Sequence, residues 1–277
     1  MSDTDIPDEI LHHYEQQVEE DLRLRDGFGE LELLRTQEVV RRHLPDGALR
    51  ILDVGGGSGV HAEWLLEDGH TVHLVDPVPS HVEQATERYG GYDRFSAEVG
   101  DARALTAPSR SYDAALLLGP LYHLVESADR VSAWSEARRV VTGEGLVFAA
   151  CITRYAPIFD GLARGALFDP RFRAIAEHDL ATGQHRNPTG EAGWFTTAYF
   201  HHPDELAEEA AGAGLRIIEV VGLEGMAGWV QGLEERWNDP EARETILFSA
   251  RAIESEPTLR GLSAHLLAVT TRGHGHG

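Results

Sequence analysis

A run of glycines directly follows a short apolar stretch near residue 50, and it is the segment of the sequence most suited to chemistry. Residues 51–59 read Ile-Leu-Asp-Val-Gly-Gly-Gly-Ser-Gly, so Asp53 lies two positions before the first glycine. Glycine allows a tight backbone turn and the close approach of a ligand. Free amide groups at the start of a helix also favour a polar or anionic ligand. The predicted ligand contacts of this loop are Asp53, Gly55, Gly56, Gly57 and Gly59.

A second acidic residue ends the next apolar stretch. Asp76 lies 19 residues beyond Gly57 and is followed by Pro77. A carboxylate at the carboxyl end of a second parallel strand can accept hydrogen bonds from both hydroxyls of a ribose. The glycine loop and Asp76 together predict an adenosine-containing ligand at the edge of a doubly wound sheet.

Two ligand classes compete for this loop. The dinucleotide pattern G-x-G-x-x-G requires glycine at position 60, where this chain has Val60. An acidic residue two places before the first glycine suits the ammonium group of an amino-acid ligand better than a pyrophosphate. A nicotinamide-dependent oxidoreductase therefore stays open as the alternative.

Five segments, in order, resemble the motifs of the class I S-adenosylmethionine-dependent methyltransferases. The resemblance covers residues 50–150 closely and the last two predicted strands more loosely. The matching segments are the acidic glycine loop at 53–59, Asp76 after strand two, Asp101 in Gly100-Asp101-Ala102, the fourth strand and its ending at 112–124, and the lead-in to strand five at 138–146. Within the family, the Leu-Tyr-His-Leu ending at 121–124 looks most like small-molecule methyltransferases of the ubiquinone-biosynthesis type.

The resemblance implies a fold and a cofactor. The expected fold is α/β, a doubly wound, seven-stranded, mostly parallel Rossmann-like sheet with its last strand inserted antiparallel, with N-terminal helices and a lid insertion. The implied cofactor is S-adenosylmethionine. Besides the glycine loop, the expected cofactor contacts are Asp76, Pro77, Asp101, Ala102, Leu118, Tyr14 and Arg35. Asp101 would lie near the adenine amino group, and Arg35 would pair with the cofactor carboxylate.

The candidate catalytic residues follow strand four. His123 is a candidate general base because its unperturbed pKa lies near neutrality, and Tyr122 would face the acceptor beside it. The expected acceptor contacts in the lid are Tyr155, Phe159, Trp194, Tyr199 and His201. The alternative for each of these residues is packing alone.

Apolar periodicity predicts alternating helices and strands beyond residue 50. The sequence divides into an N-terminal helical cap (1–48), a cofactor-binding core (49–152), a lid insertion (153–200), the C-terminal part of the sheet (201–272) and a disordered tail (273–277). The cap is expected to hold helices at 6–26 and 30–44. The middle of the lid, 181–193, is polar and rich in glycine. Connections of that length inside a compact domain are usually lids or binding loops.

Composition excludes several classes of protein. The net charge of −22 argues against nucleic acid as a partner, because phosphate backbones need a basic face. The single cysteine, Cys151, excludes an intrachain disulfide framework and a cysteine-rich zinc site, and no metal is expected. The chain shows no apolar run of about 18 residues and no signal-like N-terminus. We therefore expect a cytoplasmic protein with no membrane partner, and we consider a homodimer for its assembly.

The function predicted from these residues is methyl transfer from S-adenosylmethionine to an oxygen or nitrogen of a small molecule. A non-catalytic S-adenosylmethionine-binding protein is the second alternative, beside the oxidoreductase. The sequence does not identify the acceptor.

Overall fold

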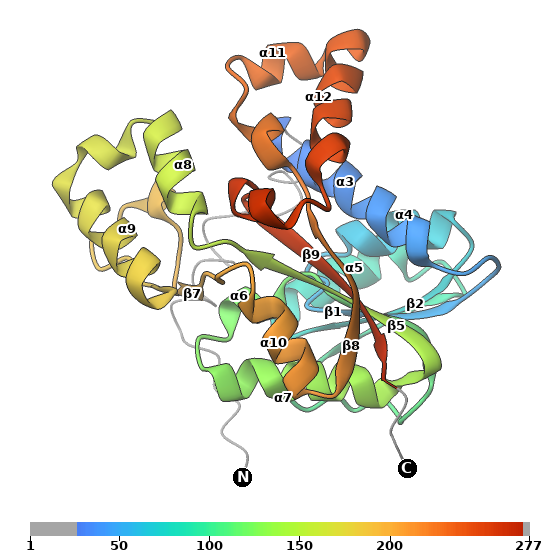
Figure 1. Ribbon diagram of the computed structural model, residues 1–277. Coiled ribbons are helices and arrows are strands. Elements are labelled where there is room, and N and C mark those ends of the chain that lie inside the picture. The colour runs from blue at the N-terminus through green and yellow to red at the C-terminus, as the bar shows by residue number, and fades with distance from the viewer. Residues whose placement is uncertain (1–26, 274–277) are drawn as a thin grey trace.

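A seven-stranded sheet forms the centre of the protein, for which we use a computed structural model that describes residues 27–273 (Figure 1). The predicted helix at 6–26, Tyr14 and residues 274–277 of the tail lie outside the described residues. The strands of the sheet are β1 (Arg50–Val54), β2 (Thr71–Asp76), β3 (Phe95–Val99), β4 (Tyr112–Leu117), β5 (Val141–Ile152), β8 (Leu215–Gly222) and β9 (His265–Arg272).

The strand order confirms the predicted fold class. The order is β3-β2-β1-β4-β5-β9-β8, and β9 runs antiparallel between β5 and β8. The other neighbouring strands pair in parallel. Because β1 and β4 are adjacent while β2 and β3 extend to the other side, the strand order reverses at the carboxyl end of β1. Open α/β sheets bind their ligands at such a switch point.

Helices cover both faces of the sheet, as the hydrophobic pattern of the strands requires. Successive strand residues point to opposite faces, so Ile51 packs on one side and Leu52 on the other. The Leu52 face is covered by α7 (Ser127–Val140) and α10 (Glu205–Gly212). The Ile51 face is covered by α3 (Gly27–His43) and α4 (Val60–Glu67), and by Tyr89 at the end of α5 (Pro79–Tyr89).

The segment between β5 and α10 is more structured than the polar pattern at 181–193 suggests. It contains α8 (Ala156–Ala163), η1 (Ala166–Phe168), α9 (Pro170–Thr182), β6 (Gln184–His185), η2 (Ala192–Trp194) and β7 (Ala198–Tyr199). Asp169 caps α9, since its side chain accepts a hydrogen bond from the Arg171 amide. A two-stranded β6–β7 pair follows. In Figure 1 α8 and α9 lie together, apart from α11 and α12.

A second helical segment separates β8 from β9. It holds η3 (Gly225–Trp229), α11 (Leu233–Trp237), α12 (Pro240–Ile253) and η4 (Pro257–Leu262). Its buried side chains, including Trp237 and Leu247, form a separate hydrophobic cluster with Leu31 of α3. The N-terminal helix α3 therefore joins the sheet to this late segment of the chain.

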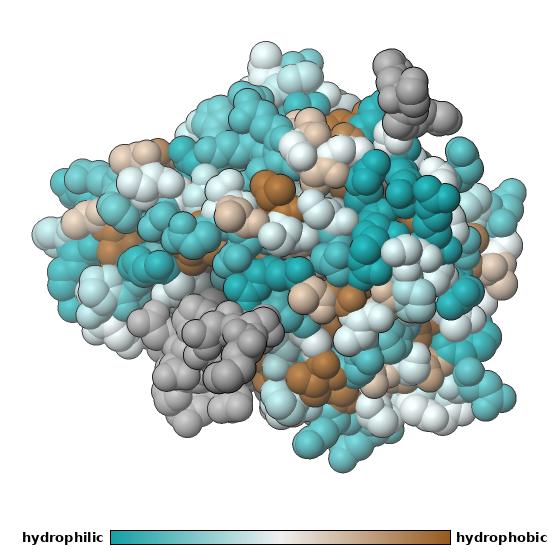
Figure 2. All heavy atoms as spheres, turned by 90° about the horizontal axis from the view of Figure 1, so that it is seen from below, coloured by the Kyte–Doolittle hydropathy of each residue, from teal (hydrophilic) through white to brown (hydrophobic). Residues whose placement is uncertain are grey.

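The hydropathy of the surface and of the helices bears on whether the protein contacts a membrane. The face shown in Figure 2 is mostly hydrophilic, with hydrophobic residues in small separate patches. Among residues 27–273, no helix combines the length and the apolar character that crossing a bilayer requires.

Candidate active site

The glycine loop follows β1 and turns tightly into α4. Gly55 has φ 69° and Gly57 has φ 56°, both in the left-handed region that favours glycine. The Gly55 amide donates a hydrogen bond of 2.7 Å to the carbonyl oxygen of Val75, so the loop is tied to β2. The sequence places these two glycines where the backbone needs them.

Close approach also limits this loop to small residues. A Cβ atom at Gly55 would lie 2.8 Å from the ring of Pro120, which begins α6 (Pro120–His123). A Cβ atom at Gly56 would lie 2.6 Å from Oδ2 of Asp53. At Gly57, in contrast, no heavy atom lies within 4 Å of the corresponding position, so the loop is open there.

Asp76 at the end of β2 is oriented by backbone amides. Its Oδ2 accepts a hydrogen bond of 2.8 Å from the Gly57 amide, and its Oδ1 accepts one of 2.9 Å from the Val78 amide. Oδ1 also lies 3.1 Å from Nδ1 of His81. A carboxylate has about four acceptor positions, so Asp76 retains capacity for a ligand. Its contact with Gly57 fixes it beside the open part of the loop.

Asp53 is a buried carboxylate with no hydrogen-bond partner among the described residues. Only 1% of the residue is exposed, and neither Oδ1 nor Oδ2 has a partner. Burial, followed by repulsion from Asp76, raises the pKa of this carboxyl to about 7. Buried polar atoms are nearly always satisfied in folded proteins. A cationic ligand group beside Asp53 would supply the missing partner, and the ammonium group of S-adenosylmethionine fits this requirement.

The two candidate catalytic residues lie in α6, directly after β4. The rings of Tyr122 and His123 meet edge to face, with centroids 4.6 Å apart. The His123 ring is stacked against Phe195 of the lid at a centroid distance of 6.3 Å. Phe195 has φ 61° and ψ 174°, a backbone conformation that is rare outside glycine. The structure therefore brings His123 together with the lid and brings Pro120 of the same helix against the glycine loop.

Asp101, expected near the adenine, already has a strong partner. Nη2 of Arg103 lies 2.6 Å from Oδ2 of Asp101, and Nε of Arg103 lies 3.0 Å from Oδ1. Arg103 also reaches Asp129 at 3.1 Å. A role for Asp101 at the adenine stays a prediction and would require it to share its carboxylate with Arg103.

The predicted contact between Arg35 and the cofactor carboxylate is not supported. The Arg35 side chain is fully buried, and its guanidinium forms ion pairs with Glu38 and with Glu254 at the end of α12. Its Nε donates to the carbonyl oxygen of Leu223 at 3.1 Å. Arg35 thus joins α3 to the segment after β8, and its donors are used within the protein.

His201 and Tyr199 are also placed differently from the prediction. His201 is fully buried, its Nε2 lies 3.3 Å from Oε2 of Glu209, and burial lowers its pKa. The Tyr199 ring lies under Arg130, with 3.6 Å from the guanidinium carbon to the ring centroid, and its hydroxyl donates to Glu205 at 3.0 Å. These side chains join the lid to α7 and α10, so contact with an acceptor stays a prediction for both.

The remaining predicted acceptor contacts divide into separate groups. Phe159 packs on Trp229, with ring centroids 5.5 Å apart, and Trp229 in turn contacts Phe28. Tyr155 lies beside His202. Trp194 packs on Phe172 within the lid. Phe159 and Tyr155 stay candidates for the acceptor pocket, whereas Trp194 belongs to the packing of α9.

Two residues near this edge of the sheet were not identified from the sequence: Trp229 and His265. Trp229 lies in a segment with no strong periodicity, and its neighbours come from distant parts of the chain. His265 begins the last predicted strand and could have been noticed as a polar residue at a sheet edge.

The family model and the two curated relatives that match this chain are all described as methyltransferases. Residues 51–145 match the model of a methyltransferase domain. A ubiquinone biosynthesis O-methyltransferase of Methylocella silvestris is 30% identical over 65% of this chain, and one of Methylobacterium nodulans is 29% identical over 66%. The matches cover 62% and 66% of these relatives, so this chain spans less than two thirds of their length.

Solved structures share the fold at low sequence identity. An S-adenosylmethionine-dependent methyltransferase of Methanosarcina mazei has a TM-score of 0.57 at 16% identity, covering 84% of this chain and 96% of the other. One from Mesorhizobium loti has a TM-score of 0.55 at 20% identity, covering 87% and 100%. The [4+2]-cyclase SpnF has a TM-score of 0.54 at 18% identity, covering 88% and 82%. The fold therefore accommodates more than one reaction.

The methyltransferase domain covers β1 to the start of β5, which includes the glycine loop, Asp53 and Asp76. The relatives and the seven-stranded sheet agree with this domain match. Residues 51–145 thus resemble a methyltransferase domain, and the sheet around them has the fold of the S-adenosylmethionine-dependent methyltransferases.

Proposed function

We propose that this protein transfers the methyl group of S-adenosylmethionine to an oxygen or nitrogen of a small molecule and releases S-adenosylhomocysteine. The observation that carries the proposal is the buried carboxylate of Asp53, which has no hydrogen-bond partner within residues 27–273 and lies beside a glycine loop that bonds Asp76. A dinucleotide offers a pyrophosphate at this place, and a buried carboxylate would repel it.

In the proposed binding mode, each residue of this site contacts a different group of S-adenosylmethionine. Asp53 faces the ammonium group and Asp76 the ribose hydroxyls, with the Gly57 amide keeping the Asp76 carboxylate in place. Bound S-adenosylmethionine supplies a methyl group that its sulfonium already activates. The chain then has to hold the acceptor in line with that methyl group, and orientation of this kind is worth about 7–11 kcal/mol.

His123 is the proposed proton acceptor for an acceptor hydroxyl or protonated amine. It lies in α6 at the carboxyl edge of β4, where the switch point of the sheet places ligands. General bases contribute about 10²- to 10⁴-fold to the rate. Tyr122, Tyr155 and Phe159 are the proposed pocket side chains around the acceptor.

A screen of acceptors that detects release of S-adenosylhomocysteine tests the proposal. Hydroxylated aromatic compounds come first, because the two relatives are named as O-methyltransferases of ubiquinone biosynthesis. Binding of S-adenosylhomocysteine without transfer to any acceptor would favour the non-catalytic alternative. Homodimer formation and the absence of nucleic-acid binding stay predictions, which light scattering and a DNA mobility shift would check.

For the base, we expect His123→Ala to lower kcat by about 10²-fold and to remove one limb from the pH profile of kcat. Cofactor affinity should be nearly unchanged. His73→Ala is the matched control, because His73 lies within β2 and bonds Ser96. If His123→Ala weakens cofactor binding and leaves kcat at saturation unchanged, His123 is structural.

A further inference from the structure

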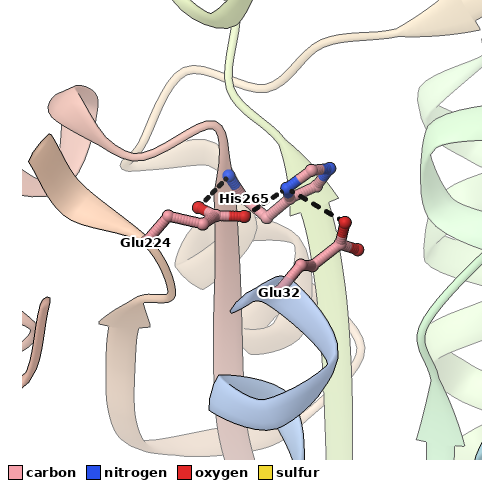
Figure 3. A group of neighbouring side chains, drawn as sticks. All are labelled: Glu32, Glu224 and His265. Carbon is pink, nitrogen blue, oxygen red and sulfur yellow. Dashed lines mark hydrogen bonds and ion pairs between the residues drawn. The ribbon is translucent and has the colours of Figure 1, made fainter. Parts of the chain in front are cut away.

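Three side chains that can bind a metal ion converge at the edge of the sheet, outside the glycine loop. Glu32 comes from α3, Glu224 follows β8, and His265 is the first residue of β9. One ligand atom from each lies within 4.8 Å of the other two. Figure 3 shows the two carboxylates pointing toward the same side of the His265 ring.

The cluster is held in place by surrounding hydrogen bonds. Glu224 is fully buried, and its Oε2 accepts hydrogen bonds of 2.6 Å from Ser263 Oγ and 3.1 Å from the His265 amide. Ser263 Oγ accepts in turn from the amides of Glu224 and Gly225. Outer contacts of this kind orient metal ligands. His265 itself is fixed by the pairing of β9 with Ile152 at the end of β5.

Both carboxylates approach the same ring nitrogen. Nδ1 of His265 lies 2.5 Å from Oε1 of Glu224 and 3.7 Å from Oε2 of Glu32. One N–H group cannot donate a well-aligned hydrogen bond to two carboxylates. At His185, in contrast, each ring nitrogen has its own oxygen neighbour: Asp179 lies at Nδ1 and the Trp194 carbonyl oxygen at Nε2. Convergence of three ligand atoms on one point is the geometry that a cation needs.

The negative charge of the two carboxylates also favours a bound cation. A buried carboxylate costs several kcal/mol unless a positive charge accompanies it. Arg35 bonds the neighbouring Leu223 carbonyl oxygen, but its guanidinium forms ion pairs with Glu38 and Glu254. A cation among Glu32, Glu224 and His265 would neutralise two carboxylates in a chain whose net charge is −22.

We propose that Glu32, Glu224 and His265 form a binding site for a divalent transition-metal ion such as Mn²⁺. Two carboxylate oxygens and one imidazole nitrogen suit such an ion better than Mg²⁺ or Ca²⁺, which prefer oxygen ligands. Metal–ligand distances of about 2.0–2.2 Å require Nδ1 of His265 and Oε1 of Glu224 to move apart. They also require the most distant pair of ligand atoms to move slightly closer together. The ion binds Nδ1 of the neutral imidazole, whose proton then lies on Nε2, so binding exchanges the Glu224–His265 hydrogen bond for metal–ligand bonds.

The proposed metal site uses none of the residues proposed to hold the cofactor or to accept the proton. It lies where β5 ends, and β4 separates β5 from β1 and its glycine loop. The ion would join α3 to β9 and to the segment after β8. Its binding can therefore be measured without a methyl acceptor, and failure of either proposal leaves the other standing.

Titration of the full chain with Mn²⁺, followed by electron paramagnetic resonance and calorimetry, tests the site. His274 and His276 are replaced by alanine throughout, so that the tail histidines cannot bind the ion. We expect one ion per chain and at least 10-fold weaker binding of Mg²⁺. Absence of stoichiometric Mn²⁺ binding would overturn the proposal and leave His265 hydrogen-bonded to Glu224.

Two variants and one control decide which residues hold the ion. Glu32→Gln and His265→Ala should each weaken Mn²⁺ binding by about 10-fold or more. His178→Ala, which removes an exposed histidine of α9, should leave binding unchanged. Glu32 is partly exposed on α3, so Glu32→Gln decides the outcome even if His265→Ala fails to fold. Unchanged Mn²⁺ affinity in Glu32→Gln would overturn the proposal.

Discussion

Asp53 shows how a single residue can favour ligand binding at the expense of stability. Its carboxyl group has a pKa of about 7, whereas an unfolded chain would ionise it near 3.8. The folded, ligand-free protein therefore holds a proton that the unfolded chain has released between about pH 4 and pH 7. Stability falls as the pH rises through that window. Three pKa units correspond to about 4 kcal/mol.

We expect Asp53→Asn to stabilise the ligand-free protein at pH 8 and to weaken cofactor binding. The amide removes the charge but leaves a buried polar group unpaired, so the gain should be about 1–3 kcal/mol. At pH 4.5 the gain should disappear, because Asp53 is then neutral in the folded state. Urea unfolding at the two pH values measures the gain, and calorimetry measures an expected 10- to 100-fold loss of S-adenosylhomocysteine affinity.

The matched control is Asp46→Asn, at an exposed position before β1. It should change neither stability nor affinity by more than about 0.5 kcal/mol. Equal stability of Asp53→Asn and the parent at both pH values would show that Asp53 already has a partner in the ligand-free protein.

Phe195 combines an unfavourable backbone conformation with a ring against His123. Phe195→Gly and Phe195→Ala both remove the ring, but only glycine adopts φ 61° and ψ 174° at low cost. We expect both variants to raise the KM for the acceptor, with the glycine variant about 1 kcal/mol more stable than the alanine variant. Thermal unfolding compares the two. Equal stability would mean that the backbone of residue 195 is not strained.

At the scale of elements, buried ion pairs connect segments that are distant in sequence. Arg35 of α3 reaches Glu254 at the end of α12, and Arg130 of α7 reaches Glu209 of α10. Hydrophobic periodicity predicts each helix separately but does not indicate which helix it will contact. Periodicity therefore could not indicate that Arg35 pairs with Glu254, which lies 219 residues away in the sequence.

We expect Arg35→Ala to destabilise the protein by about 1.5–3 kcal/mol, because it removes the buried charged hydrogen bonds of Arg35 while Arg251 and Arg42 still pair with Glu38 and Glu254. Arg41→Ala on the same helix is the control. Arg41 is 43% exposed in its pair with Asp68, and such pairs contribute about 0–1 kcal/mol. Chemical denaturation measures both variants. Similar small losses for the two would show that Arg35 does not join α3 to α12.

The predictable part of the site is local in sequence. Gly55, Gly57 and Asp76 follow directly from strand ends and turn requirements, and the sheet that presents them follows from alternating helices and strands. The helices α8 and α9 were missed, because residues 153–183 carry no clear alternation and their packing partners are other lid residues. The Glu32–Glu224–His265 cluster depends on the pairing of β9 with β5, which no local pattern indicates.

At the scale of the whole molecule, the cofactor site connects the central strands. The glycine loop contacts β2 through Val75 and α6 through Pro120, so β1, β2 and β4 all end at the proposed ligand. A ligand bound at this edge should therefore raise the free energy of unfolding of the whole domain. At 100 times its Kd, a ligand that binds only the folded state adds about 2.7 kcal/mol.

We therefore expect S-adenosylhomocysteine at that concentration to raise the Tm by about 5–10 °C, since 1 kcal/mol corresponds to about 2–4 °C for a chain of this size. NAD at the same concentration should leave the Tm unchanged, because the loop has Val60 where a dinucleotide pattern has glycine and keeps Asp53 buried beside it. In Asp76→Asn the response to the same concentration of S-adenosylhomocysteine should shrink, because the ribose loses a charged acceptor. Differential scanning calorimetry with each ligand measures these shifts in Tm. A Tm shift with NAD alone would favour the oxidoreductase. A Tm shift with S-adenosylhomocysteine that is unchanged in Asp76→Asn would place the ribose away from Asp76.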